Sequence, residues 1–179
     1  MLPSRLSAEP RQRIVVDRIV AVVDHFPITL LELRRRAASA TAANSDLPEG
    51  ERLPANRAAE NQVLDELIDD RVIGIVAASE RMTVSDEEID KAIGSVMKDQ
   101  NLTTEKLDEA LVAAGLSRDD YRGLIRGQLL RGKVVLAKVW PTLRGVHFDD
   151  PDATNAAIDK GLRVYVDKER LNHFIEKRY

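Results

Sequence analysis

The pattern of apolar and polar positions first indicates a strand between residues 13 and 23. β-Branched side chains, which suit a pleated strand better than a helix, are frequent there and include Val15, Val16, Ile19, Val20, Val22 and Val23. The sequence DHFPIT then interrupts the run, and Pro27, which has no N–H to donate, belongs in the turn or at a sheet edge. Thr29 and Glu32 have the spacing of a capping box. We therefore predict a strand, a tight turn, a very short return strand, and a helix that runs to about Asn44.

A long helix is predicted after Pro54, beyond a loop with the sequence NSDLPEGERLPAN. Apolar residues recur there at spacings of three and four, which is the mark of a helix with one buried face. These residues are Val63, Leu64, Leu67, Ile68, Val72, Ile75 and Val76. The pattern predicts that this helix is the main support of the core.

Three shorter helices are predicted next, each with its own start signal. Ser85 and Glu88 form a capping box, a threonine at 103 or 104 caps the second helix, and Ser117 caps the third. Gly115 ends the second helix. Pro141, which cannot continue a helix, ends the third.

The C-terminal segment, residues 145–179, is predicted to form one broken helix or two short ones. Asp150 can cap it, and Pro151 then takes the first helical position. Its apolar positions are Ile158, Leu162, Tyr165, Leu171, Phe174 and Ile175. Because burial of each such side chain stabilises by about 1.5–3 kcal/mol, we predict that this tail docks on the long helix around Leu64 to Ile75. The polar connection before it permits docking in the same chain or a swap into a second copy.

The composition is that of an ordinary soluble protein. The chain has 179 residues, of which 44% are hydrophobic and 32% are charged, so it can bury a core. It has no cysteine, which excludes disulfides and cysteine-ligated metal. The longest apolar run, residues 19–23, is far shorter than the about 20 residues that cross a bilayer, so we expect no stable membrane insertion. The order of charges is not that of a signal peptide, and residues 1–12 indicate a disordered lead-in.

No grouping of side chains points to catalysis, a cofactor or a metal. Neighbouring acids such as Asp69 and Asp70 diverge by about 100° on a helix, so they rarely converge on one reacting atom. His25, His147 and His173 are far apart in sequence and lack a metal-binding spacing. Phosphate-binding glycine loops and nucleophile-elbow patterns are also missing from the sequence. We therefore expect no enzyme, no cofactor and no metal site.

The basic run RGLIRGQLLRGK, residues 122–133, is the one feature that suggests nucleic acid. Its charges alternate with apolar residues that a core needs, and the net charge of −3 argues against non-specific nucleic-acid binding. We predict a solvated or salt-bridged face, the alternative being contact with acidic partners or membrane-proximal surfaces. Gly123, Gly127 and Gly132 are predicted to permit the close approach of another helix or a bend.

Five apolar residues are candidates for binding a client peptide: Met82, Met97, Leu102, Tyr121 and Trp140. Methionine adapts to varied apolar partners, and Trp140, which precedes Pro141, is predicted at a half-exposed helix end. The alternative for residues at helical spacing is ordinary core packing.

The order of these elements resembles the N-terminal domain of the SurA family of periplasmic chaperones. Three segments carry the resemblance: DRIVAVVDHFPITLLEL, VLDELIDDRVIGIVAASERMTVSDEEID and LDEALVAAGLSRDDYRGLIRGQLLRGKVV. Together they cover roughly residues 15–139. The resemblance implies a multi-helix fold with a small N-terminal β-hairpin and a C-terminal helix that packs back. It also implies a division into a lead-in (residues 1–12), a chaperone domain (13–144) and a C-terminal helical segment docked on that domain (145–179).

The chain departs from this family after Pro141, where members usually continue into parvulin-type prolyl isomerase domains. The residues that follow lack the HIL opening, and His147 alone cannot make such a site. We therefore expect a periplasmic holdase without isomerase activity, which binds apolar segments of unfolded outer-membrane or secreted proteins as a monomer or domain-swapped dimer. The alternatives are an isomerase-family protein with an unrecognised site and a helical adaptor for one dedicated partner.

Overall fold

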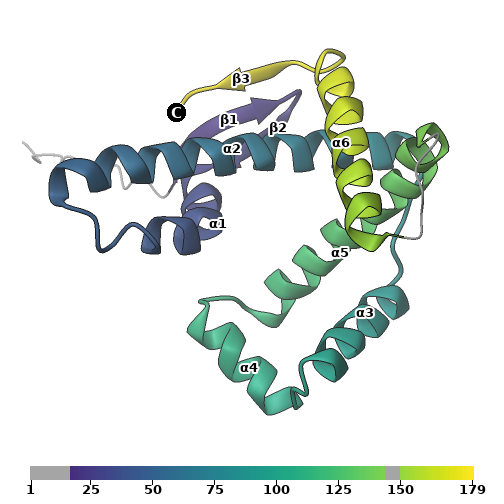
Figure 1. Cartoon of the computed structure of the whole chain (residues 1–179), viewed down its shortest axis with the longest axis horizontal. Helices are drawn as coiled ribbons and strands as arrows, with labels where there is room; N and C mark the ends of the chain where they lie inside the picture. The colour runs from purple at the N-terminus through teal and green to yellow at the C-terminus, as the bar shows by residue number, and fades with distance from the viewer. Residues whose placement is uncertain (1–16, 144–149) are drawn as a thin grey trace, which may run out of the picture.

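The computed structural model describes residues 17–143 and 150–179, and the mainly α prediction is confirmed for them (Figure 1). Within these residues, six α-helices accompany a three-stranded antiparallel sheet whose strand order is β2-β1-β3. The longest helix, α2, runs through the centre of the molecule and contacts the elements on both sides of it. The predictions for residues 1–12, for Val15 and Val16 and for His147 lie outside the described residues.

The predicted hairpin is present. Strand β1 (Ile19–Val23) pairs antiparallel with β2 (Phe26–Thr29). Asp24 in the turn has a φ of 54°, a left-handed conformation that Asp adopts more readily than a β-branched residue does. Val20 and Ala21 are both fully buried, which agrees with a break in the register between Ile19 and Ala21. One side of the sheet therefore contributes closely packed aliphatic side chains to the core.

Helix α1 (Leu30–Ala42) starts where the sequence predicts, because the Thr29 hydroxyl accepts a hydrogen bond from the Glu32 N–H. The predicted loop before the long helix is partly wrong, since α2 (Glu49–Ser79) begins five residues before Pro54. Pro54 removes one backbone hydrogen bond near the exposed start of the helix, where the loss is tolerated more easily than in the centre. Glu49 and Glu51 favour the helix there, because acidic groups stabilise the N-terminal end of the helix dipole.

Helices α3 (Asp86–Asp99), α4 (Thr104–Ala113) and α5 (Arg118–Val134) form an arm below α2 (Figure 1). The capping box at Ser85 is present as predicted. A second capping box starts α5, where Ser117 and Asp120 exchange the same two hydrogen bonds. These starts are encoded within four residues, so they can be found in the sequence.

Three helices end in the same motif. Arg81 after α2, Asn101 after α3 and Gly115 after α4 all have φ between 50° and 68°. In each case the following N–H reaches back to a carbonyl five residues earlier, as from Leu102 to Met97 at 2.8 Å. This pattern is the Schellman motif, which satisfies the last free carbonyls of a helix and reverses the chain. The arm is therefore folded by its local sequence.

Helix α5 continues into a π-helical turn, η1 (Val135–Val139), and a 3-10 turn, η2 (Trp140–Thr142), which contains Pro141. Gly123, Gly127 and Gly132 do not provide the predicted close approach, since a Cβ at any of them would meet nothing within 4 Å. The close approach lies at Gly161 instead, where a Cβ would stand 2.7 Å from Val139 Cγ1. Glycine is required at that point because the π-helical turn packs directly on the backbone.

The tail forms a helix and then a strand. Helix α6 (Pro151–Arg170) is capped by Asp150 as predicted, and it packs back across α2 and the π-helical turn. The prediction of a second short helix is wrong, because residues 175–177 form strand β3 (Ile175–Lys177), which pairs with β1. The register pairs Ala21 with Lys177 and Val23 with Ile175. A partner strand more than 150 positions away decides this structure, and no local pattern reports it.

Two cores share helix α2. The first is built from β1, β2, α1 and the middle of α2 (residues 63–72), and its fully buried members include Leu33, Leu64 and Ile68. The second joins Ile73 and Ala77 of α2 to Val134, Val139, Leu162 and Val166. Ile175 and Tyr179 of the tail pack on the first core, whereas α6 packs on the second. The tail thus docks on α2 within its own chain, over a longer stretch than predicted.

Candidate functional site

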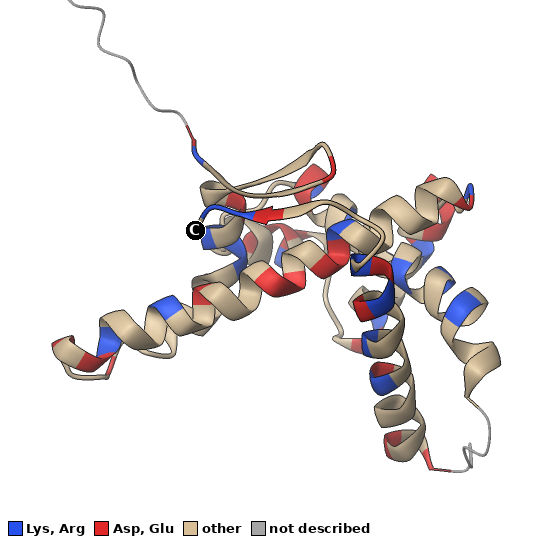
Figure 2. Cartoon of the chain, turned by 90° about the horizontal axis from the view of Figure 1, so that it is seen from above, with Lys and Arg blue, Asp and Glu red and all other residues tan. Residues whose placement is uncertain are grey.

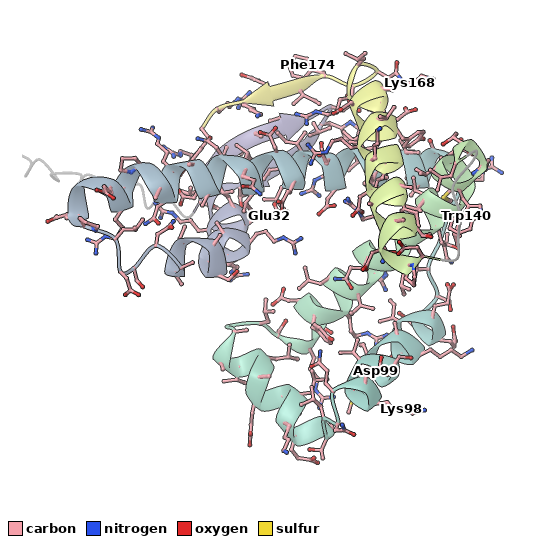
Figure 3. All side chains as sticks on the ribbon, in the orientation of Figure 1. Glu32, Lys98, Asp99, Trp140, Lys168 and Phe174 are labelled. Atoms are coloured by element: carbon pink, nitrogen blue, oxygen red, sulfur yellow. The ribbon has the colours of Figure 1, made fainter. Side chains whose placement is uncertain are left out.

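The five predicted client-binding residues are spread over four segments of the fold. Met82, just after α2, is half-buried against the second core. Trp140 follows the π-helical turn and is 42% exposed (Figure 3). Met97 and Leu102 are half-buried at the corner between α3 and α4, and Tyr121 is half-buried in the first turn of α5. Met97 and Leu102 lie close together, since the Leu102 N–H donates to the Met97 carbonyl at 2.8 Å.

Exposed apolar surface also lies on α1 and α5. Hydrogen bonds from Ser117 lower the pKa of Asp120, and the Arg35 guanidinium of α1 adds to this effect. Arg35 belongs to α1 and Asp120 to the first turn of α5. Leu31 lies four residues before Arg35 and Leu124 four residues after Asp120, so each leucine shares the face of its charged neighbour. Leu31 is 48% exposed and Leu124 is 41% exposed. We call this surface, defined by Leu31, Arg35, Asp120 and Leu124, the α1–α5 face.

Sequence reasoning missed both leucines of the α1–α5 face. In the segment LLEL, Leu33 is fully buried, whereas Leu31 two positions earlier is half exposed. The alternation follows from helical geometry, but the sequence does not say which side of α1 rests on α2. The only available signal was the excess of leucine over what one buried stripe needs.

Ion pairs attach both sides of this face to α2. The Arg71 guanidinium of α2 donates to Glu32 of α1 at 3.1 Å and to the Pro27 carbonyl at 3.3 Å. On the other side, Arg131 of α5 donates to Asp70 of α2 at 3.0 Å. Such exposed pairs contribute little stability, but they fix the directions in which α1 and α5 leave the central helix.

The basic run of α5 is salt-bridged, as predicted. Arg122 bonds Asp86 and Asp90 of α3, and Arg126 bonds Asp86 at 3.2 Å. Lys133 pairs with Glu88 at 2.8 Å. The hydrogen bond that Lys133 donates is the main cause of the lowered pKa of Glu88. The positive charges of α5 are thus largely used inside the arm, which leaves no continuous basic surface on this part of α5.

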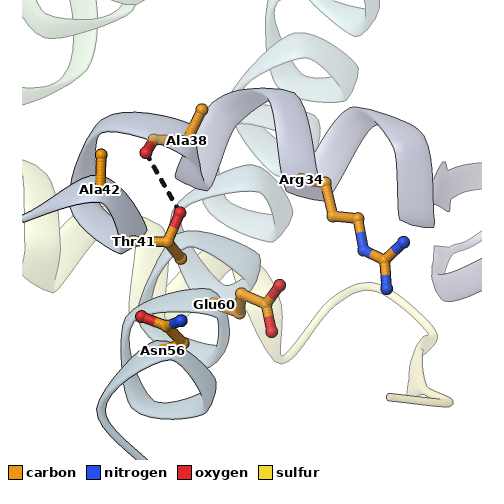
Figure 4. Close-up of a pocket in the computed structure, with 6 residues that line it drawn as sticks. All are labelled: Arg34, Ala38, Thr41, Ala42, Asn56 and Glu60. Carbon is orange, nitrogen blue, oxygen red and sulfur yellow. Dashed lines mark hydrogen bonds between the residues drawn. The ribbon is translucent and has the colours of Figure 1, made fainter. Parts of the chain in front are cut away.

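Two pockets flank α1 where it packs on α2. The first has a volume of about 450 Å³ and is lined by Arg34, Ala38, Thr41, Ala42, Asn56 and Glu60 (Figure 4). Thr41 Oγ1 donates to the Ala38 carbonyl at 3.1 Å, and Glu60 accepts a hydrogen bond from the Tyr179 hydroxyl. This bond, with burial, raises the pKa of Tyr179. The polar groups of the pocket therefore hold the fold together and do not converge on an open position where a substrate could react.

The described residues contain no group of three or more His, Asp or Glu side chains that could hold a metal ion. Across the same residues, none of the helices is both long and apolar enough to cross a membrane. Charged residues of both signs lie where α6 crosses α2 (Figure 2), and Arg170 pairs there with Asp65 and Asp69.

Comparison with known proteins matches this architecture to one family. The model of the SurA N-terminal domain matches residues 16–135, which extend from the start of the hairpin to the end of α5. The chain is 34% identical over 131 residues to Chaperone SurA of Dechloromonas aromatica, covering 73% of this chain and 29% of that protein. It is 32% identical over 114 residues to Chaperone SurA of Saccharophagus degradans, covering 64% of this chain and 26% of that protein. The chain thus spans under a third of the length of these relatives.

Proposed function

This chain belongs to the SurA N-terminal domain family, and we propose that it is a holdase-type chaperone that binds apolar segments of unfolded proteins. The observation that carries the proposal is the family match across the hairpin, α1, α2 and the arm, since two relatives with the same region are named Chaperone SurA. The proposed activity requires no isomerase chemistry and no cofactor.

The exposed apolar side chains support this proposal. Leu31 and Leu124 lie on opposite sides of the α1–α5 face, and Val112 of α4 is 78% exposed on the arm. Burial of apolar surface gives non-directional attraction, so a surface of this kind accepts varied sequences. Separate small contacts, each weak, suit a chaperone that must release its client.

The family also supports a proposal for the compartment and the clients. We place the protein in the periplasm, with unfolded outer-membrane or secreted proteins as its clients. The contacts of α6 and β3 with their own chain favour a monomer, and a swapped dimer would preserve the same contacts between two copies. The five residues Met82, Met97, Leu102, Tyr121 and Trp140 remain proposed client contacts beside the α1–α5 face.

The test is suppression of aggregation, measured by light scattering when an unfolded outer-membrane protein is diluted from denaturant. The unaltered chain in modest molar excess is expected to suppress scattering. The double variant L31S/L124S is expected to suppress it less, because it removes apolar surface from the α1–α5 face without opening a core. Leu53→Ser is the matched control, since Leu53 is 72% exposed near the start of α2, away from this face.

Two results would contradict the proposal. If the unaltered chain leaves the light scattering of the diluted outer-membrane protein unchanged, the proposed holdase activity is contradicted. Catalysis above background in a protease-coupled proline-peptide assay would show an isomerase, and with it a site that the sequence and structure do not indicate.

A further inference from the structure

Strand β3 leaves its outer backbone groups open. The Asp24 N–H donates to the Phe174 carbonyl at 2.7 Å, and the Arg178 N–H donates to the Val20 carbonyl at 2.7 Å. In an antiparallel ladder, alternate residues point their N–H and C=O to the same side. Phe174, Glu176 and Arg178 therefore face β1, whereas Ile175 and Lys177 point their N–H and C=O away from it. Among the described residues, no hydrogen bond engages these four outward groups.

The opposite edge of the sheet is closed. Val22 uses its backbone groups toward Glu176 of β3, so its partner on β2, Pro27, points outward. Pro27 has no N–H, and its carbonyl already accepts a hydrogen bond from Arg71 at 3.3 Å. Edges are commonly blocked in this way because free edges pair with other chains. The β2 edge is therefore closed to a further strand, whereas the β3 edge has free N–H and C=O groups.

The edge of β3 is also held in position. Asp24 Oδ1 accepts from the Phe174 N–H at 2.9 Å, and Asp24 Oδ2 lies 2.8 Å from His173 Nδ1. Lys177, whose charge would otherwise guard the edge, is bound to Asp65 of α2 at 2.7 Å. A strand fixed before binding loses little conformational freedom when a partner pairs with it.

We infer that the outer edge of β3 binds an extended segment of an unfolded polypeptide, which adds as a fourth strand to the sheet. This inference rests on the proposed function and names one contact that performs it. Backbone pairing reads no sequence, which suits a chaperone with varied clients. Phe174, which directly precedes the strand, is 63% exposed (Figure 3). Leu171, four residues before Ile175, is 86% exposed.

A second copy of this chain fits the edge less well. Two β3 strands related by a two-fold axis would pair antiparallel, with the residue at the axis opposite its own copy. An axis at residue 176 sets Glu176 opposite Glu176, and an axis at residue 177 sets Lys177 opposite Lys177. Only an axis at residue 175 avoids both of these pairs of like charges. Like charges directly opposite each other destabilise a sheet. An unfolded client has no such fixed charge pattern, so it is the favoured occupant.

The test uses the full chain and a soluble ten-residue peptide of alternating valine and threonine with lysine at both ends. Amide hydrogen exchange followed by NMR reports each N–H. The amides of Ile175 and Lys177 are expected to exchange fast in the free chain and slowly when peptide is bound. The amides of Glu176 and Arg178, which already pair with β1, are expected to change little.

A variant pair separates the N–H from the side chain. Lys177→Pro removes one outward N–H and leaves the ladder to β1 intact, and Lys177→Ala removes only the side chain. Because one hydrogen bond is lost, the proline variant is expected to bind the peptide about 3- to 10-fold more weakly than the alanine variant. Equal melting temperatures of the two variants would show that β3 stays docked in both.

Each other outcome overturns the inference in a distinct way. Peptide binding without protection of Ile175 and Lys177, and with equal affinity for both variants, places the client elsewhere and leaves the proposed function standing. Failure to bind the peptide together with failure to suppress aggregation removes both proposals. Protection that increases with protein concentration in the absence of peptide identifies a second copy as the occupant.

Discussion

Arg170 joins the tail to the central helix through two carboxylates. Its guanidinium lies 3.1 Å from Asp65 and 2.9 Å from Asp69, and its side chain is only 25% exposed. Burial raises the pKa of Asp69, and the charge of Arg170 opposes that rise. Arg170→Ala is therefore expected to lower the free energy of unfolding by about 1–2 kcal/mol, as typical for lost hydrogen bonds to partly exposed charged groups.

The measurement is urea denaturation at pH 7, with Arg163→Ala as the control. Arg163 is exposed on the same helix and forms no ion pair among the described residues. Equal stability of the two variants would show that the Arg170 contacts do not hold the tail.

Gly161 and Gly127 offer opposite predictions for the same substitution. Gly161→Ala places a methyl group 2.7 Å from Val139 Cγ1, so it is expected to destabilise by about 1–3 kcal/mol. Gly127→Ala meets nothing within 4 Å and is expected to stabilise by about 0.4–1 kcal/mol, because alanine restricts the unfolded chain. Thermal denaturation distinguishes the two, and a stabilised Gly161→Ala would contradict the close packing of α6 on the π-helical turn.

Asp24 gives the chain a predictable response to acid. The N–H of Phe174, followed by His173, lowers the pKa of Asp24 below its usual 3.8. Because the pKa is lower in the folded state than in the unfolded chain, the stabilisation is present above pH 3.8 and is lost as the pH falls through the folded-state pKa. Asp24→Asn is expected to lower the melting temperature at pH 7 and to reduce its further fall below pH 4.

Asparagine is the suitable replacement because it also tolerates the left-handed φ of 54° at this position. Identical pH profiles of the two proteins between pH 2.5 and 7 would show that this carboxylate does not stabilise the docked strand.

Among the elements, those with local signals were predictable from the sequence. The start of α3 at Ser85, the start of α5 at Ser117 and the end of α4 at Gly115 depend on residues within one turn. Strand β3 was not predictable, because it exists through pairing with β1 and its apolar residues also fit a helix. The α1–α5 face was not predictable for a related reason. The exposure of Leu31 depends on how α1 packs on α2, and this tertiary contact is not encoded in the local sequence.

The tail is predicted to be an essential element of the fold. Truncation after Gly145 removes α6 and β3, so it exposes Ile73 and Val139 of the second core and frees the edge of β1. We expect a large fall in melting temperature and loss of solubility. A milder truncation after Leu171 keeps α6 on the second core. Its melting temperature is expected to lie between those of the full chain and of the chain truncated after Gly145. A chain shortened after Gly145 that keeps its melting temperature would show the tail to be a free appendage.

At the scale of the whole molecule, α2 is the common support of the two cores. The hairpin and α1 pack on the middle of α2, α6 and the π-helical turn pack toward its C-terminal end, and β3 returns to the core that contains the hairpin (Figure 1). The arm leaves from the end of α2, so the α1–α5 face lies between two elements fixed to one rigid helix. Leu31 of α1 and Leu124 of α5 stay exposed in this arrangement, as the proposed binding of an unfolded client requires.

Binding to one polypeptide in its unfolded and folded forms tests this conclusion most directly. A fluorescently labelled outer-membrane protein, kept unfolded by dilution or folded in detergent micelles, is titrated with the chain and followed by fluorescence anisotropy. We predict saturable binding to the unfolded form and none to the folded form, with weaker binding of L31S/L124S than of Leu53→Ser. Equal binding of both forms, or no binding of the unfolded form, would contradict the proposed chaperone function.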